Sequence, residues 1–359
     1  MMATPKGALK GLFTDARPNA AGETPQGSLG RVLVLGGSGF IGIVALLNAG
    51  YAVTLVNRGR VYWQKDMSSL PGVSHVKADR ENSKAFAEAL REVTGSRPWV
   101  GVVDFSAYKP RHVEAALEGL GSHFGIYIYI STDSVYEVSD KAAWEKAEAV
   151  LEEFAQRPAD AARADILARM DRYGHKKFLC EDHLKAFAVG SGRQCVALRL
   201  ADVIGPYDDT HRLWAYWWWC KYSGVSPILV PEGGDSQPLN FTFSADVADV
   251  VTLLMQQSHE HPLIGAKDEC FTAFNIHPFL SVAMPWSVCL QACEETLTLI
   301  ELLCLASSGR RAVGKPLSLC GAQERNLVGF PLPCAMLLRR LVPGYKQQSL
   351  LTRTRRGLH

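Results

Sequence analysis

Residues 31–42 read Arg-Val-Leu-Val-Leu-Gly-Gly-Ser-Gly-Phe-Ile-Gly. The aliphatic run that opens this stretch is typical of a strand buried in a parallel sheet. The glycine spacing Gly36-x-x-Gly39-x-x-Gly42 predicts a tight turn from the strand into a helix. In such a turn the backbone comes close to a pyrophosphate, and the first N–H groups of the helix bind its charge. The residues expected to bind a dinucleotide here are Gly36, Gly37, Ser38, Gly39, Phe40, Ile41 and Gly42.

A second strand is expected at residues 52–56, directly after Gly50, which is the expected cap of the first helix. This strand ends at Asn57 and Arg58, about 20 residues after the glycine turn, where a Rossmann unit places the residue that contacts the adenosine ribose. An enzyme that selects NAD usually has an acidic residue there. Arg58, together with Arg60, is instead suited to pair with a 2′-phosphate, so the pattern favours NADP over NAD as cofactor.

Strand-like and helix-like segments alternate along the first 205 residues. Strands are expected at 73–77, 99–105, 124–130 and 195–200, and helices at 82–94, 110–120 and 173–189. This alternation predicts a doubly wound α/β fold with a parallel sheet and right-handed crossovers. Ligands of such sheets bind at the carboxyl ends of the strands. We therefore expect Asp79 and Arg80 to flank the adenine, and Ser106 and Ala107 to line the mouth of the site.

Two separate motifs carry side chains suited to proton transfer. Ser131-Thr132-Asp133 stands at the end of the fifth expected strand, and Tyr173 and Lys177 share one face of a later helix. A lysine ammonium beside a phenol favours the phenolate and lowers the tyrosine pKa from about 10 towards neutrality. Together with the Thr132 hydroxyl, the pair predicts a proton relay for a carbonyl or alcohol beside a nicotinamide.

Several motifs in combination resemble the extended short-chain dehydrogenase/reductase superfamily, and within it the NAD-dependent epimerase/dehydratase group. They are the glycine turn, Ser-Thr-Asp-Ser-Val-Tyr at 131–136, Tyr-Gly-His-Lys-Lys at 173–177, Leu-Arg-Leu-Ala-Asp-Val-Ile-Gly-Pro at 198–206 and Phe-Ser-Ala-Asp-Val-Ala at 243–248. The resemblance covers about residues 31–276. It implies a Rossmann fold with a small C-terminal substrate lobe, an NAD(P) cofactor, and a hydroxyl or keto substrate such as a nucleotide sugar. It also implies catalysis by Thr132, Tyr173 and Lys177.

Two details of the resemblance affect the expected function. Asp133 matches the acid in the Ser-Thr-Asp-Glu motif of nucleotide-sugar dehydratases, but Ser134 replaces their glutamate base, which argues against a full dehydratase cycle. The Asn57-Arg58-Gly59 ending also resembles an atypical branch that includes chloroplast stem-loop RNA-binding proteins. The alternative function is therefore a non-catalytic dinucleotide-fold protein that binds RNA or acts as a regulator, which would need no proton relay.

We expect four parts along the chain. Residues 1–29 are small, polar and rich in Pro and Gly, and predict a disordered arm. The Rossmann domain is expected over 30–205, with an exposed helical insertion at about 139–170, and an interleaved substrate lobe over 206–307. Residues 308–359 contain ten Lys or Arg and one acidic residue, and predict a basic tail that has no catalytic residue and is a candidate RNA contact.

Composition restricts the class of protein further. With 359 residues, a net charge of +2 and 47% hydrophobic residues, the chain as a whole has no bias towards nucleic acid or membranes. Nine cysteines without a paired C-x-x-C predict reduced thiols in a cytoplasmic protein, with neither a disulfide framework nor a metal site. No apolar run reaches the ~20 residues that span a bilayer. Targeting to an organelle is not excluded by the sequence. The family resemblance is also compatible with a homodimer.

Two segments depart from the family's pattern. Between Gly42 and Gly50 only seven residues remain for the first helix, about three fewer than is typical, which is most of one turn. Residues 277–291 separate a strand-like segment at 271–276 from a helical one at 292–303. Without them the joined sequence resembles the family's usual ending, so we interpret 277–291 as a translated in-frame intron or a splice variant.

Overall fold

The computed structural model describes residues 28–36, 43–60, 67–143, 150–205, 240–260 and 270–276, and the single positions Asp208, Thr210, Ala215, Trp218 and Tyr222. The chain divides into two compact units, one of residues 1–210 with 241–278 and one of 211–240 with 279–359. All strands and helices described below belong to the first unit. In the second unit the rings of Trp218 and Tyr222 stack, with centroids 4.9 Å apart.

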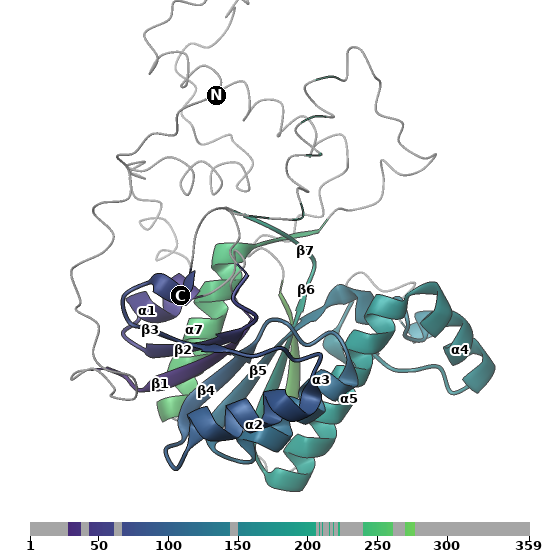
Figure 1. Ribbon diagram of the computed structural model, residues 1–359. Helices are drawn as coiled ribbons and strands as arrows, with labels where there is room; N and C mark the ends of the chain where they lie inside the picture. The colour runs from purple at the N-terminus through teal and green to yellow at the C-terminus, as the bar shows by residue number, and fades with distance from the viewer. Residues whose placement is uncertain are drawn as a thin grey trace, which may run out of the picture. The chain divides into compact units, whose positions relative to one another are not determined.

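Seven parallel strands form the central sheet (Figure 1). They are β1 (Arg31–Leu35), β2 (Ala52–Asn57), β3 (Val73–Lys77), β4 (Trp99–Asp104), β5 (Phe124–Thr132), β6 (Gln194–Leu200) and β9 (Phe271–Ile276). Their order in space is β3-β2-β1-β4-β5-β6-β9, so the direction of winding reverses between β1 and β4. A separate parallel pair joins β7 (Asp202–Ile204) to β8 (Phe241–Phe243).

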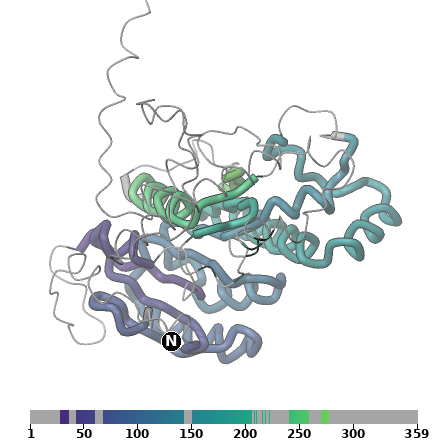
Figure 2. Tube along the Cα trace, turned by 90° about the horizontal axis from the view of Figure 1, so that it is seen from above, coloured from purple at the N-terminus to yellow at the C-terminus, as the bar shows by residue number. Residues whose placement is uncertain are grey.

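Helices cover both faces of the sheet (Figures 1 and 2). On one face lie α2 (Ser83–Thr94), α3 (Pro110–Leu120) and α5 (Arg172–Ser191). On the other face lie α1 (Ile43–Asn48) and α7 (Ser244–Glu260). A further helix, α4 (Ala161–Met170), packs against α5 and has no buried residue. Single 3-10 turns are η1 (Met67–Ser69), η2 (Asp133–Val135), η3 (Lys141–Ala143) and η4 (Glu152–Phe154).

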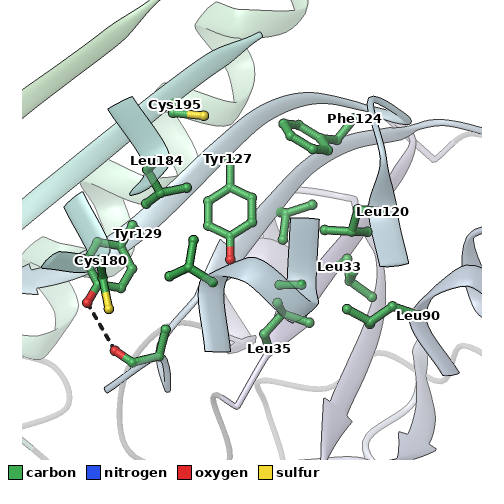
Figure 3. Packing of buried hydrophobic residues seen from close by; sticks show 14 of the residues in the cluster. Leu33, Leu35, Leu90, Leu120, Phe124, Tyr127, Tyr129, Cys180, Leu184 and Cys195 are labelled. Carbon is green, nitrogen blue, oxygen red and sulfur yellow. Dashed lines mark hydrogen bonds between the residues drawn. The ribbon is translucent and has the colours of Figure 1, made fainter. Parts of the chain in front are cut away.

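The two faces have separate apolar cores because side chains alternate along each strand. Strands β1, β4 and β5 are buried on both faces, which explains why their sequences are almost continuously hydrophobic. Under α3 and α5 the core contains the aromatic rings of Phe124, Tyr127 and Tyr129, packed with Leu184 (Figure 3). The hydroxyl of Tyr129 donates to the carbonyl of Ala107 at 3.0 Å, which joins this core to the loop after β4.

The structure confirms the predicted doubly wound α/β fold. Helix α1 ends just before Gly50, which has a φ of +91° and whose N–H donates to the carbonyl of Leu47 at 3.0 Å. Strand β5 runs two residues beyond its predicted end, because Ser131 and Thr132 continue to pair with β6. These two residues are therefore held by the sheet rather than by a loop.

Among the described residues, the insertion expected at 139–170 contains an α-helix only in its second part, and its first part has the 3-10 turn η3. Residues 150–160 cross the surface with the single turn η4, and α4 follows. Phe154 and Leu167 pack onto a small apolar cluster that includes Val135, Tyr136 and Phe178. This part of the insertion is thus anchored beside the start of α5, although α4 itself is largely exposed.

Several predictions fall on residues outside the described segments. These are the arm up to residue 27, the glycine turn at 37–42, most of the expected substrate lobe, the segment 277–291 and the basic tail at 308–359. At the end of the expected arm, the N–H of Leu29 donates to the carbonyl of Gly50 at 3.1 Å. None of the helices in the described part of the chain has the length and apolar character needed to cross a membrane.

Candidate active site

The start of α5 lies at the carboxyl end of β5. Asp171 caps the helix, and its Oδ1 accepts hydrogen bonds from the N–H groups of Tyr173 and Gly174 at 2.9 and 2.8 Å. A Cβ atom at Gly174 would collide with the carbonyl of Ser134 and the carboxylate of Asp171. Glycine at this position therefore allows α5 to pack directly on η2, which brings Tyr173 next to the motif that ends β5.

Lys177 lies one turn further along α5 and is buried, with 2% of its surface exposed. Its Nζ donates to the carbonyl of Ile130 at 2.7 Å. The ring centroids of Tyr129, Tyr108 and Tyr173 lie 4.8, 4.9 and 5.9 Å from Nζ. Aromatic rings attract a cation through their faces. Burial lowers the pKa of Lys177 from its usual 10.5 to about 8, so the ammonium is still the main form at neutral pH.

Tyr108 belongs to this group, although the sequence did not single it out as a site residue. It directly follows Ala107 in the loop after β4, and its ring centroid is 6.3 Å from that of Tyr173. Both rings are about half exposed, at 49% for Tyr108 and 46% for Tyr173. In the sequence, Tyr108 is recognisable only as an aromatic residue beside Ser106 and Ala107. Its contact with Lys177 depends on the tertiary fold, so no local pattern predicts it.

Thr132, the last residue of β5, is buried at the same edge of the sheet. Its Oγ1 lies 3.2 Å from Oδ1 of Asp133, to which it can donate, and accepts a hydrogen bond from the N–H of Ser134 at 3.3 Å. Desolvation of its carboxyl raises the pKa of Asp133, and the negative charge of Asp202 adds to the increase. The hydroxyl and this carboxyl stand together between β5 and the start of α5.

The reversal in strand order between β1 and β4 has small residues on both sides. Gly36 has a φ of +87°, and a Cβ atom there would lie 2.6 Å from Oγ of Ser106. The Ser106 hydroxyl itself donates to the carbonyl of Leu35 at 3.3 Å. Ligands of open α/β sheets bind at such a reversal, and a dinucleotide requires the backbone to approach it closely. Glycine at this position allows the close contact with Ser106, and its place at the reversal is the one where such sheets bind a dinucleotide.

A buried ion pair fixes the loop that carries Ser106. Nη1 and Nη2 of Arg80 donate to Oδ1 and Oδ2 of Asp104 at 2.6 and 2.9 Å. Oδ1 also accepts from the N–H groups of Ser106 and Ala107, both at 3.0 Å, and the Tyr127 hydroxyl donates to Oδ2 at 2.7 Å. Burial alone would raise the pKa of Asp104, but the Arg80 guanidinium and these hydrogen bonds hold it below its usual value.

The side chain of Arg80, which was predicted to flank the adenine, is directed into the protein, and its role beside the adenine stays a prediction. It is buried and directed at Asp104, and Nη1 also donates to Oγ of Ser106 at 2.8 Å. Asp79 is exposed at the end of β3, and its Oδ1 accepts from the N–H of Glu81 at 3.1 Å. A contact of Asp79 with the adenine stays a prediction.

The other predicted cofactor residues follow the carboxyl edge of the sheet. Asn57 and Arg58 lie at the end of β2, and Ser106 and Ala107 lie after β4. The predicted phosphate ligands Gly37, Ser38, Gly39, Phe40, Ile41 and Gly42 lie outside the described residues. Among described residues no group of His, Cys, Asp and Glu side chains has an arrangement that could hold a metal ion.

A doubly wound parallel sheet with a glycine at the reversal defines a Rossmann-type protein. A model described as the NAD dependent epimerase/dehydratase family matches residues 32–265. This match spans more than half of the sequence, so the chain belongs to the NAD-dependent epimerase/dehydratase family and is an NAD(P)-dependent enzyme of that kind. No curated protein gives a significant match to the chain.

Several solved structures share the fold. The UDP-glucose 4-epimerase of Thermus thermophilus in complex with NAD has a TM-score of 0.54 at 19% identity, over 75% of this chain and 83% of that one. The UDP-N-acetylglucosamine 4-epimerase of Methanobrevibacter ruminantium in complex with UDP-N-acetylmuramic acid has a TM-score of 0.54 at 17% identity, over 76% of this chain and 83% of that one. The dTDP-glucose 4,6-dehydratase of Bacillus anthracis in complex with NAD has a TM-score of 0.53 at 16% identity, over 75% of this chain and 81% of that one.

Proposed function

We propose that this enzyme is an oxidoreductase or epimerase that transfers a hydride between an NAD(P) cofactor and a hydroxyl or keto carbon of a nucleotide-linked sugar. The observation that carries the proposal is the buried Lys177 ammonium, 5.9 Å from the ring of the half-exposed Tyr173. The substrate class is supported by the family and by fold neighbours that are named for UDP-sugars and dTDP-glucose.

Each residue of the relay has a separate task. The phenol oxygen of Tyr173 takes the proton from the substrate hydroxyl, or returns it to the keto oxygen. Lys177 keeps a positive charge beside the phenol, which favours the phenolate, and it also donates to the nicotinamide ribose. The Thr132 hydroxyl donates to the same substrate oxygen. When bound, the nicotinamide supplies the hydride chemistry, and the three side chains bind and move the proton.

The residues after Thr132 favour redox or epimerase chemistry over dehydration. A dehydratase must also remove a proton from one carbon and deliver one to a leaving hydroxyl, which requires an additional acid and base. Asp133 can serve as such an acid, because desolvation raises its pKa. At the next position, however, Ser134 has no carboxylate to serve as the base. With Asp133 and Ser134 at these positions, the enzyme returns the hydride to the sugar without eliminating water from it.

The cofactor preference that we propose is NADP. The end of β2 carries Asn57 and the exposed Arg58, in place of the acidic residue that binds a ribose 2′-hydroxyl in NAD enzymes. Arg60 is also exposed in the same loop. A guanidinium pairs with a phosphate through two parallel hydrogen bonds, so an arginine here stabilises the 2′-phosphate that distinguishes NADP.

A substrate screen with Tyr173→Phe tests the proposed function. Purified full-length protein is mixed with NADP⁺ or NAD⁺ and a panel of UDP- and dTDP-sugars, and the reduced nicotinamide and the epimerised sugars are measured. We expect turnover with at least one member of the panel, and a loss of at least ~100-fold in Tyr173→Phe while cofactor binding is kept. Equal turnover in Tyr173→Phe would contradict the relay. Cofactor binding without turnover of any substrate would favour the non-catalytic alternative.

A further inference from the structure

Polar and charged side chains from two strands meet where β2 and β3 end. Asn57 pairs with Lys77 and Leu55 pairs with His75 in the parallel register. Because side chains alternate along a strand, Asn57, His75 and Lys77 point to the same face as Leu55, which is the face covered by α1. Arg58 follows immediately in the loop after β2.

The Asn57 side chain is held in one orientation by two donors. Its Oδ1 accepts a hydrogen bond from the N–H of Gly59 at 2.7 Å and another from Nε2 of His75 at 2.9 Å. An amide oxygen only accepts, so Nε2 of His75 carries the proton in this contact. Both contacts use the oxygen of Asn57, and its NH₂ group therefore points away from them as a donor.

Lys77 lies across the loop that carries Arg58. Gly59 has a φ of +73°, and Cδ and Cε of Lys77 lie 3.7 Å from the place that a Cβ of Gly59 would occupy. The ammonium is one bond beyond Cε, so it is held beside this loop. The aliphatic part of an exposed lysine commonly packs on a surface while its charge stays in water.

The positive charges at this edge have no carboxylate partner among the described residues. None of the ion pairs within the described segments includes Arg58 or Lys77. The two acids that follow β3 make other contacts, since Asp79 accepts from a backbone N–H and Glu81 pairs with Lys109 and a neighbouring arginine. Uncompensated like charges held close together favour an anionic ligand.

We propose that Lys77 and Arg58 together bind the phosphate monoester on the 2′-oxygen of the adenosine ribose, and that His75 positions the Asn57 amide as a further donor to it. The proposal rests on the proposed function, in which the dinucleotide lies along this edge of the sheet. A phosphate dianion has three acceptor oxygens, and the strand and the loop supply an ammonium, a guanidinium and an amide. A free 2′-hydroxyl gains none of the ionic contacts, so Lys77 determines specificity for NADP.

Binding of three ligands to matched variants of the full chain tests this inference. Affinities for NADPH, NADH and adenosine 2′,5′-bisphosphate are measured in wild type, Lys77→Gln, Lys77→Arg and Lys185→Gln. Lys185 is exposed on α5, so its substitution removes the same charge at a distant place. We expect Lys77→Gln to weaken binding of NADPH and the bisphosphate about tenfold, because a hydrogen bond to a charged group is lost. NADH binding should change less than about twofold, Lys77→Arg should keep most of the affinity, and Lys185→Gln should match wild type.

The outcomes separate this inference from the function on which it rests. A wild type that binds NADH as tightly as NADPH would overturn both the NADP preference and the role of Lys77. A wild type that prefers NADPH, with the same preference in Lys77→Gln, would overturn the role of Lys77 alone. A Lys77→Gln variant that loses affinity equally for NADPH and NADH would also overturn it, because the lysine would then contact a part that both dinucleotides share.

Discussion

The most unusual residue of the site is Lys177, because its charge is buried without a carboxylate beside it. No ion pair among the described residues includes its ammonium, which is held by one carbonyl and the faces of tyrosine rings. A buried charge that lacks an ionic partner costs stability, and such residues occur mainly where function requires them. The low pKa and the position beside Tyr173 are the properties that the proposed proton relay requires of its lysine.

This environment predicts opposite effects of pH on activity and on stability. The ammonium titrates at about 8 in the folded protein and at 10.5 when unfolded, so turnover should fall as the pH rises through about 8. Between these values the unfolded chain binds more protons than the folded one, so the contribution of Lys177 to the free energy of unfolding should rise with pH, by at most about 3 kcal/mol. Activity profiles and denaturant unfolding of wild type and Lys177→Met, compared from pH 7 to 10.5, measure the two effects.

At each pH the free energy of unfolding of Lys177→Met is subtracted from that of the wild type. The difference no longer contains the titration of the other groups. A constant difference between the two proteins across this range would mean that Lys177 has an ordinary pKa. The burial described here would then not control its protonation.

The sequence indicated the residues of the proposed relay but not their surroundings. The four-residue spacing of Tyr173 and Lys177 fixes their common helix face, so the pair was recognisable without a structure. Tyr108 and the carbonyl of Ile130 come from other elements, and no local pattern connects them to a lysine on α5. The ion pair of Arg80 was not predicted for the same reason, since Arg80 follows β3 and its partner Asp104 ends β4.

Among the elements, α5 contains two glycines, Gly174 and Gly190, of which only Gly174 is required by packing. Replacing glycine by alanine inside a helix normally stabilises it by about 0.5–1 kcal/mol. Gly190→Ala should do so, because a Cβ there meets nothing within 4 Å. Gly174→Ala should instead destabilise the protein by about 2 kcal/mol, because the new Cβ would collide with η2. Denaturant unfolding of both variants checks this, and two stabilising substitutions would disprove tight packing between α5 and η2.

The loops after β3 and β4 are joined by the Arg80–Asp104 pair, and breaking the pair should damage both. Asp104→Asn leaves a buried guanidinium without its counter-charge and should lower the free energy of unfolding by about 3 kcal/mol or more. A matched control is Glu118→Gln, which removes one partner of an exposed pair at 3.4 Å and should cost less than about 1 kcal/mol. Similar losses in chemical denaturation would contradict a structural role for the buried pair.

The end of a helix or strand was predictable where one local feature of the sequence marks it, such as a capping glycine or the end of an apolar run. Gly50 ended α1, and the apolar run of β9 coincided with its predicted range. The end of β5 was missed because Ser131 and Thr132 look like loop residues, although β6 offers them backbone partners. The contact of Arg199 with Glu181, at 2.7 Å between Nη2 and Oε2, also joins β6 to α5 inside the protein, where sequence patterns predict apolar residues.

At the scale of the whole molecule, the fold follows from the alternation of buried strands with amphipathic helices. That pattern suffices for a sheet shared with epimerases and a dehydratase at only 16–19% identity. The choice of substrate could not be predicted in the same way. The substrate lobe is expected after residue 205, where the sequence departs most from the family's pattern, whereas the cofactor edge is built from strand ends with recognisable motifs.

Titration of the purified full chain with NADPH and NADH, followed by nicotinamide fluorescence and thermal unfolding, tests the central claim most directly. A ligand that binds only the folded state stabilises it by about 2.7 kcal/mol at 100 times its Kd. We predict saturable binding of both dinucleotides with NADPH the tighter, and a preference that shrinks about tenfold in Arg58→Ala. Failure of both ligands to bind or to stabilise the protein would contradict the assignment of this chain as an NAD(P)-dependent enzyme.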